Sequence, residues 1–126
     1  MIVDPSALVA VTLREQGFED MIALERALFG HRYPTLVETG MVLSARLGGN
    51  GRDVVSQSLH EFGIVSVPFG DGHWRQAIVA FERFGRGNHA AKLTFGDCLS
   101  YAVARLAAEP LLFVGDSLSA ADIVAA

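Results

Sequence analysis

The sequence opens with Met1-Ile2-Val3-Asp4-Pro5-Ser6-Ala7-Leu8-Val9-Ala10, in which a short apolar run ends on a carboxylate and passes directly into a helical pattern. Ile2 and Val3 predict an interior strand, and Asp4 lies at its carboxyl end, where open α/β sheets bind their ligands. Asp4 followed by Pro5 is also a common helix start, with aspartate as N-cap and proline in the first helical position. This stretch alone leaves a capping role and a functional role open for Asp4.

The composition indicates one folded domain that has a surface for partners. We expect a single domain over residues 1–126, and its 51 % hydrophobic content with only 19 % charged residues predicts an oligomer or partner surface. We find no secretory signal and no apolar run near the ~18 residues of a membrane span, so no membrane association is expected. The single cysteine, Cys98, suits a reducing cytoplasm. The net charge of −4 argues against strong non-specific nucleic-acid binding, but it is compatible with a nuclease whose acids surround a cation.

Helical and strand patterns alternate along the rest of the chain. We predict a mostly parallel sheet that is covered by helices on both faces, which is an α/β fold. The predicted strands cover residues 2–3, 31–33, 64–69 and 111–114. The predicted helices cover residues 4–15, 18–29 with Gly30 as C-cap, 35–47 opened by a Thr35 to Glu38 capping box, 50–62, a segment from Asp71 as cap to Phe84, and 95–108, before a short last element with Ile123 and Val124.

Four carboxylates share one kind of position. Asp4 and Asp116 each follow a buried strand, and Glu38 and Asp97 are placed in the first turn of a helix that follows a loop. Strand ends and helix starts meet at one rim of a parallel sheet, so these acids are expected to converge, and helix N-termini would keep Glu38 and Asp97 ionised. A cluster of ionised oxygens suits Mg²⁺ or Mn²⁺. Each acid also fits an ordinary cap or turn, because the Thr35 and Thr94 spacings are those of capping boxes.

One basic stretch precedes Asp97. Arg83, Arg86 and Lys92 lie in or beside a glycine-containing segment that leads into the predicted helix at residue 95. These cations could guide an RNA phosphate backbone toward the acids, or they could be ordinary solvated charges on a loop. The four histidines show no metal-ligand spacing.

Several stretches together resemble the PIN-domain toxins of the VapC type. The opening ten residues resemble the start of that family, and residues 85–102, Gly-Arg-Gly-Asn-His-Ala-Ala-Lys-Leu-Thr-Phe-Gly-Asp-Cys-Leu-Ser-Tyr-Ala, resemble its second signature. Residues 110–116 and 121–123 resemble its last core strand and closing segment, and Glu38 lies where the family has a helical glutamate. The resemblance covers essentially the whole chain, with the motifs in the family's order.

The resemblance implies a three-layer α/β/α fold and a Mg²⁺- or Mn²⁺-dependent endoribonuclease. It also implies a toxin that a cognate VapB-type antitoxin holds inactive, with a homodimer inside the complex. The family's acids carry over to Asp4, Glu38 and Asp97, with Asp4 and Asp97 as direct metal ligands and Glu38 completing the pocket or orienting water. Asp116 would then hold a second cation or act in the outer coordination sphere.

The chain departs from the family pattern at three places. Pro5 replaces a small hydroxyl residue, Thr94 stands where asparagine is common, and Gly115-Asp116-Ser117 replaces a pattern with its acid one place later. The fourth acidic position could therefore be filled by Asp116 or Asp122, or be vacant. A PIN domain that only binds RNA or a protein remains an alternative. So does an aspartate-dependent phosphoryl-transfer domain, although Ser6 breaks the Asp-x-Asp pattern of phosphatases.

Overall fold

The computed structural model describes residues 1–23, 30–31 and 33–126. Its strands are β1 (Ile2–Val3), β2 (Gly30–His31), β3 (Val65–Ser66) and β4 (Leu111–Leu112). β1 pairs with β4 and β2 pairs with β3, in both cases in parallel, and β1 lies beside β2. The strands of the described part of the chain therefore form two short parallel pairs, β1-β4 and β2-β3, with β2 close to β1, and the predicted parallel pairing is confirmed.

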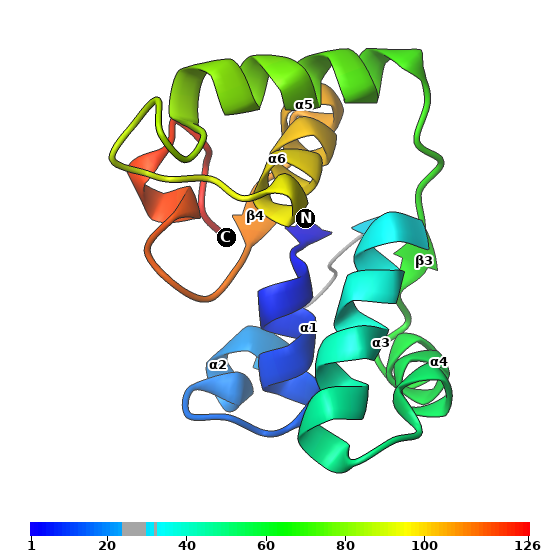
Figure 1. Cartoon of the computed structure of the whole chain (residues 1–126). Helices are drawn as coiled ribbons and strands as arrows, with labels where there is room; N and C mark the ends of the chain where they lie inside the picture. The colour runs from blue at the N-terminus through cyan, green and yellow to red at the C-terminus, as the bar shows by residue number, and fades with distance from the viewer. Residues whose placement is uncertain (24–29, 32) are drawn as a thin grey trace.

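Helices cover both sides of these strands (Figure 1). α5 (Asp71–Phe84) and α6 (Phe95–Ala107) pack against each other on one side, while α1 (Pro5–Thr12), α3 (Tyr33–Leu47) and α4 (Gly51–Glu61) form a packed group on the other. None of the described helices has the length and apolar character that crossing a lipid bilayer requires. The other described helices are α2 (Phe18–Ala23) and the short 3₁₀ turn η1 (Leu118–Ala120).

Neighbouring residues of β1 and β4 are all buried, but they pack on opposite faces and so divide the core between two groups of helices. Ile2 and Leu111 are paired across β1 and β4 and pack with the α5 and α6 side chains. Their neighbours Val3 and Leu112 are also paired, but they pack with Leu8 of α1. Successive strand residues point to opposite faces, so this division places a helical layer on each face of the sheet. The three-layer arrangement is confirmed.

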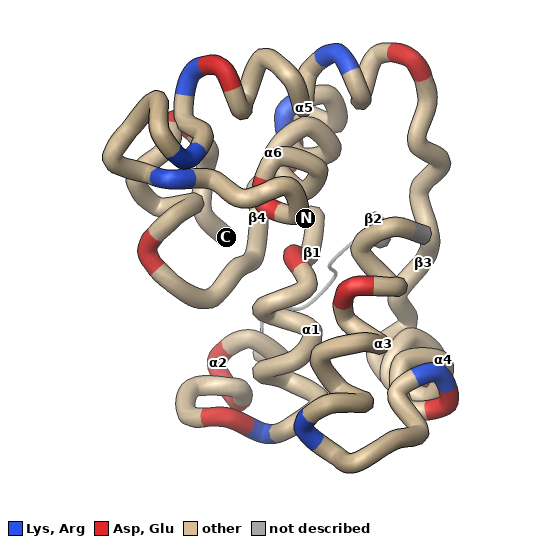
Figure 2. Tube along the Cα trace, viewed as in Figure 1, with Lys and Arg blue, Asp and Glu red and all other residues tan. Residues whose placement is uncertain are grey.

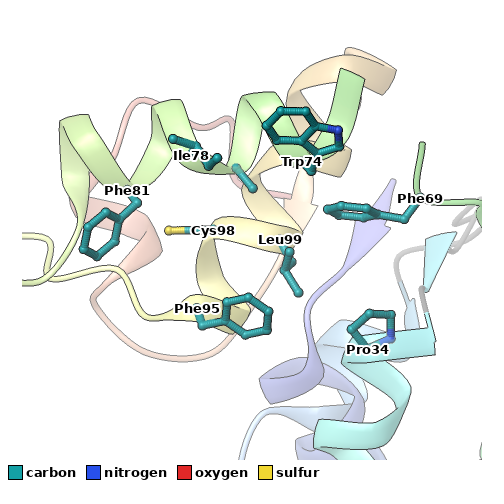
Figure 3. Close-up of a pocket in the computed structure, with 9 residues that line it drawn as sticks. Pro34, Phe69, Trp74, Ile78, Phe81, Phe95, Cys98 and Leu99 are labelled. Carbon is teal, nitrogen blue, oxygen red and sulfur yellow. The ribbon is translucent and has the colours of Figure 1, made fainter. Parts of the chain in front are cut away.

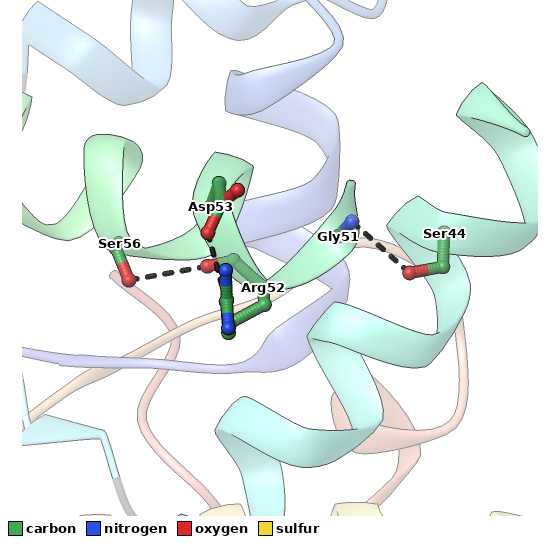
Figure 4. Close-up of polar contacts among 5 residues, drawn as sticks. All are labelled: Ser44, Gly51, Arg52, Asp53 and Ser56. Atoms are coloured by element: carbon green, nitrogen blue, oxygen red, sulfur yellow. Dashed lines mark hydrogen bonds and ion pairs between the residues drawn. The ribbon is translucent and has the colours of Figure 1, made fainter. Parts of the chain in front are cut away.

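The α3–α4 connection holds α3 firmly in place (Figure 4). Ser44 Oγ accepts a hydrogen bond of 3.1 Å from the Gly51 backbone nitrogen, which is one of the unpaired donors at the start of α4. A Cβ at Gly51 would lie only 2.9 Å from the backbone nitrogen of Ser44, and it would collide with Gly40 O. This close packing fixes the helix on which Glu38 lies.

Two predicted helix starts are wrong. α3 begins at Tyr33, so Thr35 is a buried helical residue rather than an N-cap, and Glu38 lies in the second turn. The earlier start is possible because Pro34 falls in the first turn, where a helix needs no N–H. α5 is capped by Gly70, and Asp71 is its first residue, with Oδ1 accepting a hydrogen bond of 3.2 Å from Trp74 Nε1.

The predicted strand boundaries also need correction. The strand expected over 64–69 is limited to Val65 and Ser66, both exposed, because it pairs on one side only and Pro68 has no N–H to donate. Gly30 belongs to β2 and is not a C-cap. The predicted helix over 18–29 is confirmed as far as Ala23, and its remainder lies outside the described residues.

Candidate active site

Asp4 is a buried carboxylate with one oxygen engaged and one left over. It is the N-cap of α1, and its Oδ2 accepts hydrogen bonds from Ser6 N at 2.9 Å and Ser6 Oγ at 2.5 Å. Its Oδ1 has no hydrogen-bond partner among the described residues, although Asp4 is only 4 % exposed. A buried polar atom without a partner is costly, so this oxygen is available to accept an interaction from a ligand.

Burial raises the pKa of Asp4 above its ordinary value. The hydroxyls of Ser100 and Ser6 and the Ser6 N–H lower it in part, and repulsion from Asp97 raises it further. The Ser100 hydroxyl is close enough to lower this pKa, but it forms no hydrogen bond to Oδ1. A cation at Oδ1 would supply the missing interaction and favour the ionised carboxylate.

Glu38 reaches from α3 to the start of α6. Its carboxylate lies directly against Gly96, where an added Cβ would be 3.0 Å from Glu38 Cδ and in collision with Oε2. Burial raises the pKa of Glu38, and repulsion from Asp4 and from Asp97 adds to the increase. The expectation that a helix N-terminus of its own keeps Glu38 ionised is wrong, because Glu38 lies beyond the first turn of α3.

Asp97 lies in the first turn of α6, as the sequence predicts. Its Oδ2 accepts hydrogen bonds from Thr94 N at 2.8 Å and Thr94 Oγ1 at 2.9 Å, and its backbone N–H donates to Thr94 Oγ1 at 3.3 Å. The predicted capping box is confirmed. No described contact engages Oδ1 of Asp97, so this acid also keeps one oxygen available.

Three of the four predicted acids therefore belong to one group. The charge of Asp97 raises the pKa of Asp4, and the charges of Asp4 and Asp97 raise the pKa of Glu38. Figure 2 shows acidic positions at the end of β1, near the start of α3 and at the start of α6. In the described ranges, no group of three or more His, Cys, Asp or Glu side chains is close enough together to hold a metal ion. Mg²⁺ does not need one, since it keeps several waters and binds one or two carboxylates. The donor set and the unpartnered Oδ1 fit such an ion.

The fourth acid is not brought into this group by any described contact. Asp116 is exposed, and its backbone oxygen accepts hydrogen bonds from Ser119 Oγ and from Ala120 N in the turn before η1. Asp122 is engaged elsewhere, since Tyr101 Oη donates to its Oδ1 at 2.6 Å and Arg83 pairs with its Oδ2 at 3.0 Å. The hydrogen bond from Tyr101 and the charge of Arg83 lower the pKa of Asp122.

The basic stretch divides into one structural and two accessible cations. Arg83 pairs with Asp122 and lies over the Phe84 ring. Arg86 and Lys92 are exposed, and neither belongs to an ion pair in the described part of the chain. Their loop is closed by hydrogen bonds from Arg86 N to Leu93 O and from Leu93 N to Phe84 O. It is therefore an ordered segment beside α6.

An apolar cleft between α5 and α6 was not predicted from the sequence. Its volume is about 460 Å³, and Figure 3 shows Trp74, Ile78 and Phe81 of α5 on one side, with Phe95 opposite and Pro34 of α3 at one end. Phe95, which precedes Gly96 and Asp97, is 76 % exposed. The sequence predicts an apolar stripe on α5, and the structure leaves Trp74, Ile78 and Phe81 of that stripe substantially exposed.

Comparisons with known proteins agree with this architecture. A family model described as the PIN domain matches residues 1–124. VapC ribonuclease Mb2004c of Mycobacterium bovis is 38 % identical over 98 % of this chain and 91 % of its own length. Ribonuclease VapC of Mycolicibacterium smegmatis is 34 % identical over 99 % of this chain and 98 % of its own length.

A solved structure shares the fold. The crystal structure of Mycobacterium tuberculosis VapC20, a toxin that cleaves the Sarcin-Ricin loop, covers 99 % of this chain and 97 % of its own with a TM-score of 0.79. At 19 % identity this likeness concerns the fold alone. The match of the family model over nearly all residues, together with the identity to the two curated relatives, shows that the chain belongs to the PIN-domain family, among the VapC-type proteins.

Proposed function

We propose that this protein is a Mg²⁺- or Mn²⁺-dependent endoribonuclease toxin. The observation that carries the proposal is the buried Oδ1 of Asp4, which lacks a partner among the described residues and has Glu38 and Asp97 as charged neighbours. The names of the curated relatives, which are ribonucleases of the VapC type, support RNA as the substrate. The phosphoryl-transfer alternative receives no support from these relatives.

Each acid would have a distinct part in the reaction. Asp4 Oδ1 and Asp97 Oδ1 would bind the cation, because their other oxygens are held by Ser6 and Thr94. The cation would supply positive charge to the scissile phosphate and lower the pKa of the attacking water. Glu38, which lies against the start of α6, would orient that water.

Accessible cations and a helix start would help to hold the substrate. Arg86 and Lys92 are placed in an exposed, ordered loop that leads into α6, so they would contact phosphates beside the cleaved bond. The N-terminus of α6 adds the partial positive charge of a helix start. Arg83 is assigned a structural role, since its guanidinium is paired with Asp122.

The test is expression without a partner, comparing wild type with Asp97→Asn. We expect wild type to arrest growth and degrade RNA, whereas Asp97→Asn permits growth, because the amide keeps an acceptor for Thr94 but loses the charge. Its free energy of unfolding should change by less than about 1 kcal/mol, the size of a lost cap. Equal RNA cleavage by both proteins would leave Asp97 with a purely capping role. Undiminished cleavage by wild type in excess chelator would contradict the metal dependence.

We also propose that a VapB-type antitoxin inhibits the protein and that the toxin is a homodimer. The support for a second copy is the α5–α6 cleft, which is lined by exposed apolar side chains: Trp74, Ile78, Phe81 and Phe95. With ~200 Å² for a fully exposed large side chain, their exposed fractions correspond to roughly 400 Å² of accessible apolar surface. That area is about half of what one partner contributes to a standard interface. Light scattering of the toxin alone should give twice the chain mass; a monomer would assign the cleft to the antitoxin.

A PIN domain that binds RNA without cutting it is the second candidate. The observation in its favour is that no described contact brings Asp116 to the other acids. Titration calorimetry with Mn²⁺ separates the two, since a protein that only binds RNA should show no saturable Mn²⁺ site that Asp97→Asn removes.

A further inference from the structure

Ser6 connects Asp4 to a segment more than a hundred residues away. Its Oγ donates a 2.5 Å hydrogen bond to Asp4 Oδ2 and accepts a 3.0 Å hydrogen bond from Val114 N. The direction of these two hydrogen bonds is fixed. The Val114 N–H can only donate, so the Ser6 hydroxyl accepts from it and donates its own proton to the carboxylate. Val114 lies in the segment after β4 that leads to Asp116.

The same bonds determine which oxygen of Asp4 is available. Oδ2 already accepts from the backbone and the hydroxyl of Ser6, while the buried Oδ1 has no partner in the described part of the chain. With Oδ2 held at two points, rotation of the carboxylate about its Cβ–Cγ bond would break both hydrogen bonds. The carboxylate therefore has one preferred orientation before any cation arrives.

From this geometry we propose that Ser6 is a positioning residue for the cation site: its hydroxyl holds Asp4 with Oδ1 free for the cation and ties the Val114–Asp116 segment to the first acid. The inference rests on the proposed metal-dependent function. Second-sphere partners of metal-binding carboxylates typically contribute 10- to 100-fold to metal affinity. Ser6 would have this effect without touching the metal.

The test is Mn²⁺ titration calorimetry on full-length wild type, Ser6→Ala and Ser6→Thr. Ser6→Ala keeps the backbone N–H that Asp4 caps and removes only the hydroxyl. We expect it to weaken Mn²⁺ binding about 10-fold or more, the lower end for an outer-sphere partner, and Ser6→Thr to restore it. Ser56→Ala is the matched control, since Ser56 Oγ donates a 3.1 Å hydrogen bond to Arg52 O within α4, away from the acidic group (Figure 4).

Amide hydrogen exchange gives a readout that does not depend on metal. The Val114 N–H should exchange faster in Ser6→Ala, while the Leu111 N–H, bonded to Val124 O at 2.8 Å, should not change. Unchanged Val114 exchange would overturn the proposal, as would faster exchange with unaltered Mn²⁺ affinity. Wild type that binds no Mn²⁺ would instead overturn the metal-dependent function itself, and the positioning role with it.

Discussion

Replacing Gly96 with alanine should leave the free energy of unfolding almost unchanged but weaken Mn²⁺ binding. Gly96 is the second residue of α6, and its added Cβ would lie 3.0 Å from Glu38 Cδ and closer still to Oε2. The obstacle is the end of a flexible side chain, so Glu38 should move away at a cost of roughly 0.5–1.5 kcal/mol for a distorted rotamer. Alanine in a helix gains up to about 1 kcal/mol over glycine. The two effects nearly cancel in the free energy of unfolding.

The effect on the cation site should be much larger. With Glu38 displaced, Mn²⁺ affinity measured by calorimetry should fall by about 10- to 100-fold, the range for losing a supporting carboxylate. Gly72→Ala is the matched control, because Gly72 is the second residue of α5 and its Cβ would make an ordinary 3.5 Å contact with Leu106 Cδ1. That variant should bind Mn²⁺ as wild type does.

A double variant tests whether Gly96 acts through Glu38. In a Glu38→Ala background, Gly96→Ala should have no further effect on Mn²⁺ affinity, because the side chain that it displaces is absent. Wild-type affinity in Gly96→Ala, or an equal loss in both backgrounds, would refute the reasoning that the Glu38 carboxylate belongs to the cation site.

Two further predictions follow from the pKa directions. Because the pKa values of Asp4 and Glu38 are raised in the folded protein, these acids stabilise the metal-free fold at pH values below their unfolded pKa values. This stabilisation is lost as the pH rises through their folded-state pKa values, so Mn²⁺ should raise Tm more at about pH 7.5 than at about pH 5. Calorimetric Tm shifts that are equal at both pH values would contradict this prediction. Burial and the charge of Asp97 raise the pKa of Cys98 to about 11. Iodoacetamide should therefore alkylate the folded protein far more slowly than the urea-unfolded chain at about pH 8. Equal alkylation rates, measured by mass spectrometry, would show that the fold does not protect the thiol.

The helix starts that the sequence predicted correctly depend on local residues. Asp4-Pro5 and the Thr94 to Asp97 box are complete within a few residues, and both form the helix starts expected of them. A local pattern is not always decisive, however. Thr35 and Glu38 have the same spacing as the Thr94 box, but Pro34 allows α3 to begin earlier, and the cap does not form.

The features that escaped prediction depend on contacts between distant residues. Glu38 lies against Gly96, and Ser6 Oγ accepts a hydrogen bond from Val114 N. The sequence around Glu38 or Ser6 does not predict which distant residue each one contacts. The hydroxyl two residues after Asp4 and the glycine inside the second capping box were the available signals. The apolar spacing on α5 predicted a helix correctly, but periodicity does not tell a core from a face left open for a partner.

The choice between cap and ligand, which the sequence left open, follows from counting carboxylate oxygens. Asp4 and Asp97 each use Oδ2 for hydrogen bonds at a helix start and have no described partner at Oδ1. Capping would then assist the proposed cation binding, since the helix donors fix the orientation of the carboxylate and leave its second oxygen available. Under the proposed function, Asp97→Asn should therefore preserve the start of α6 and abolish RNA cleavage. One oxygen caps the helix, and the negative charge that the amide lacks would bind the cation.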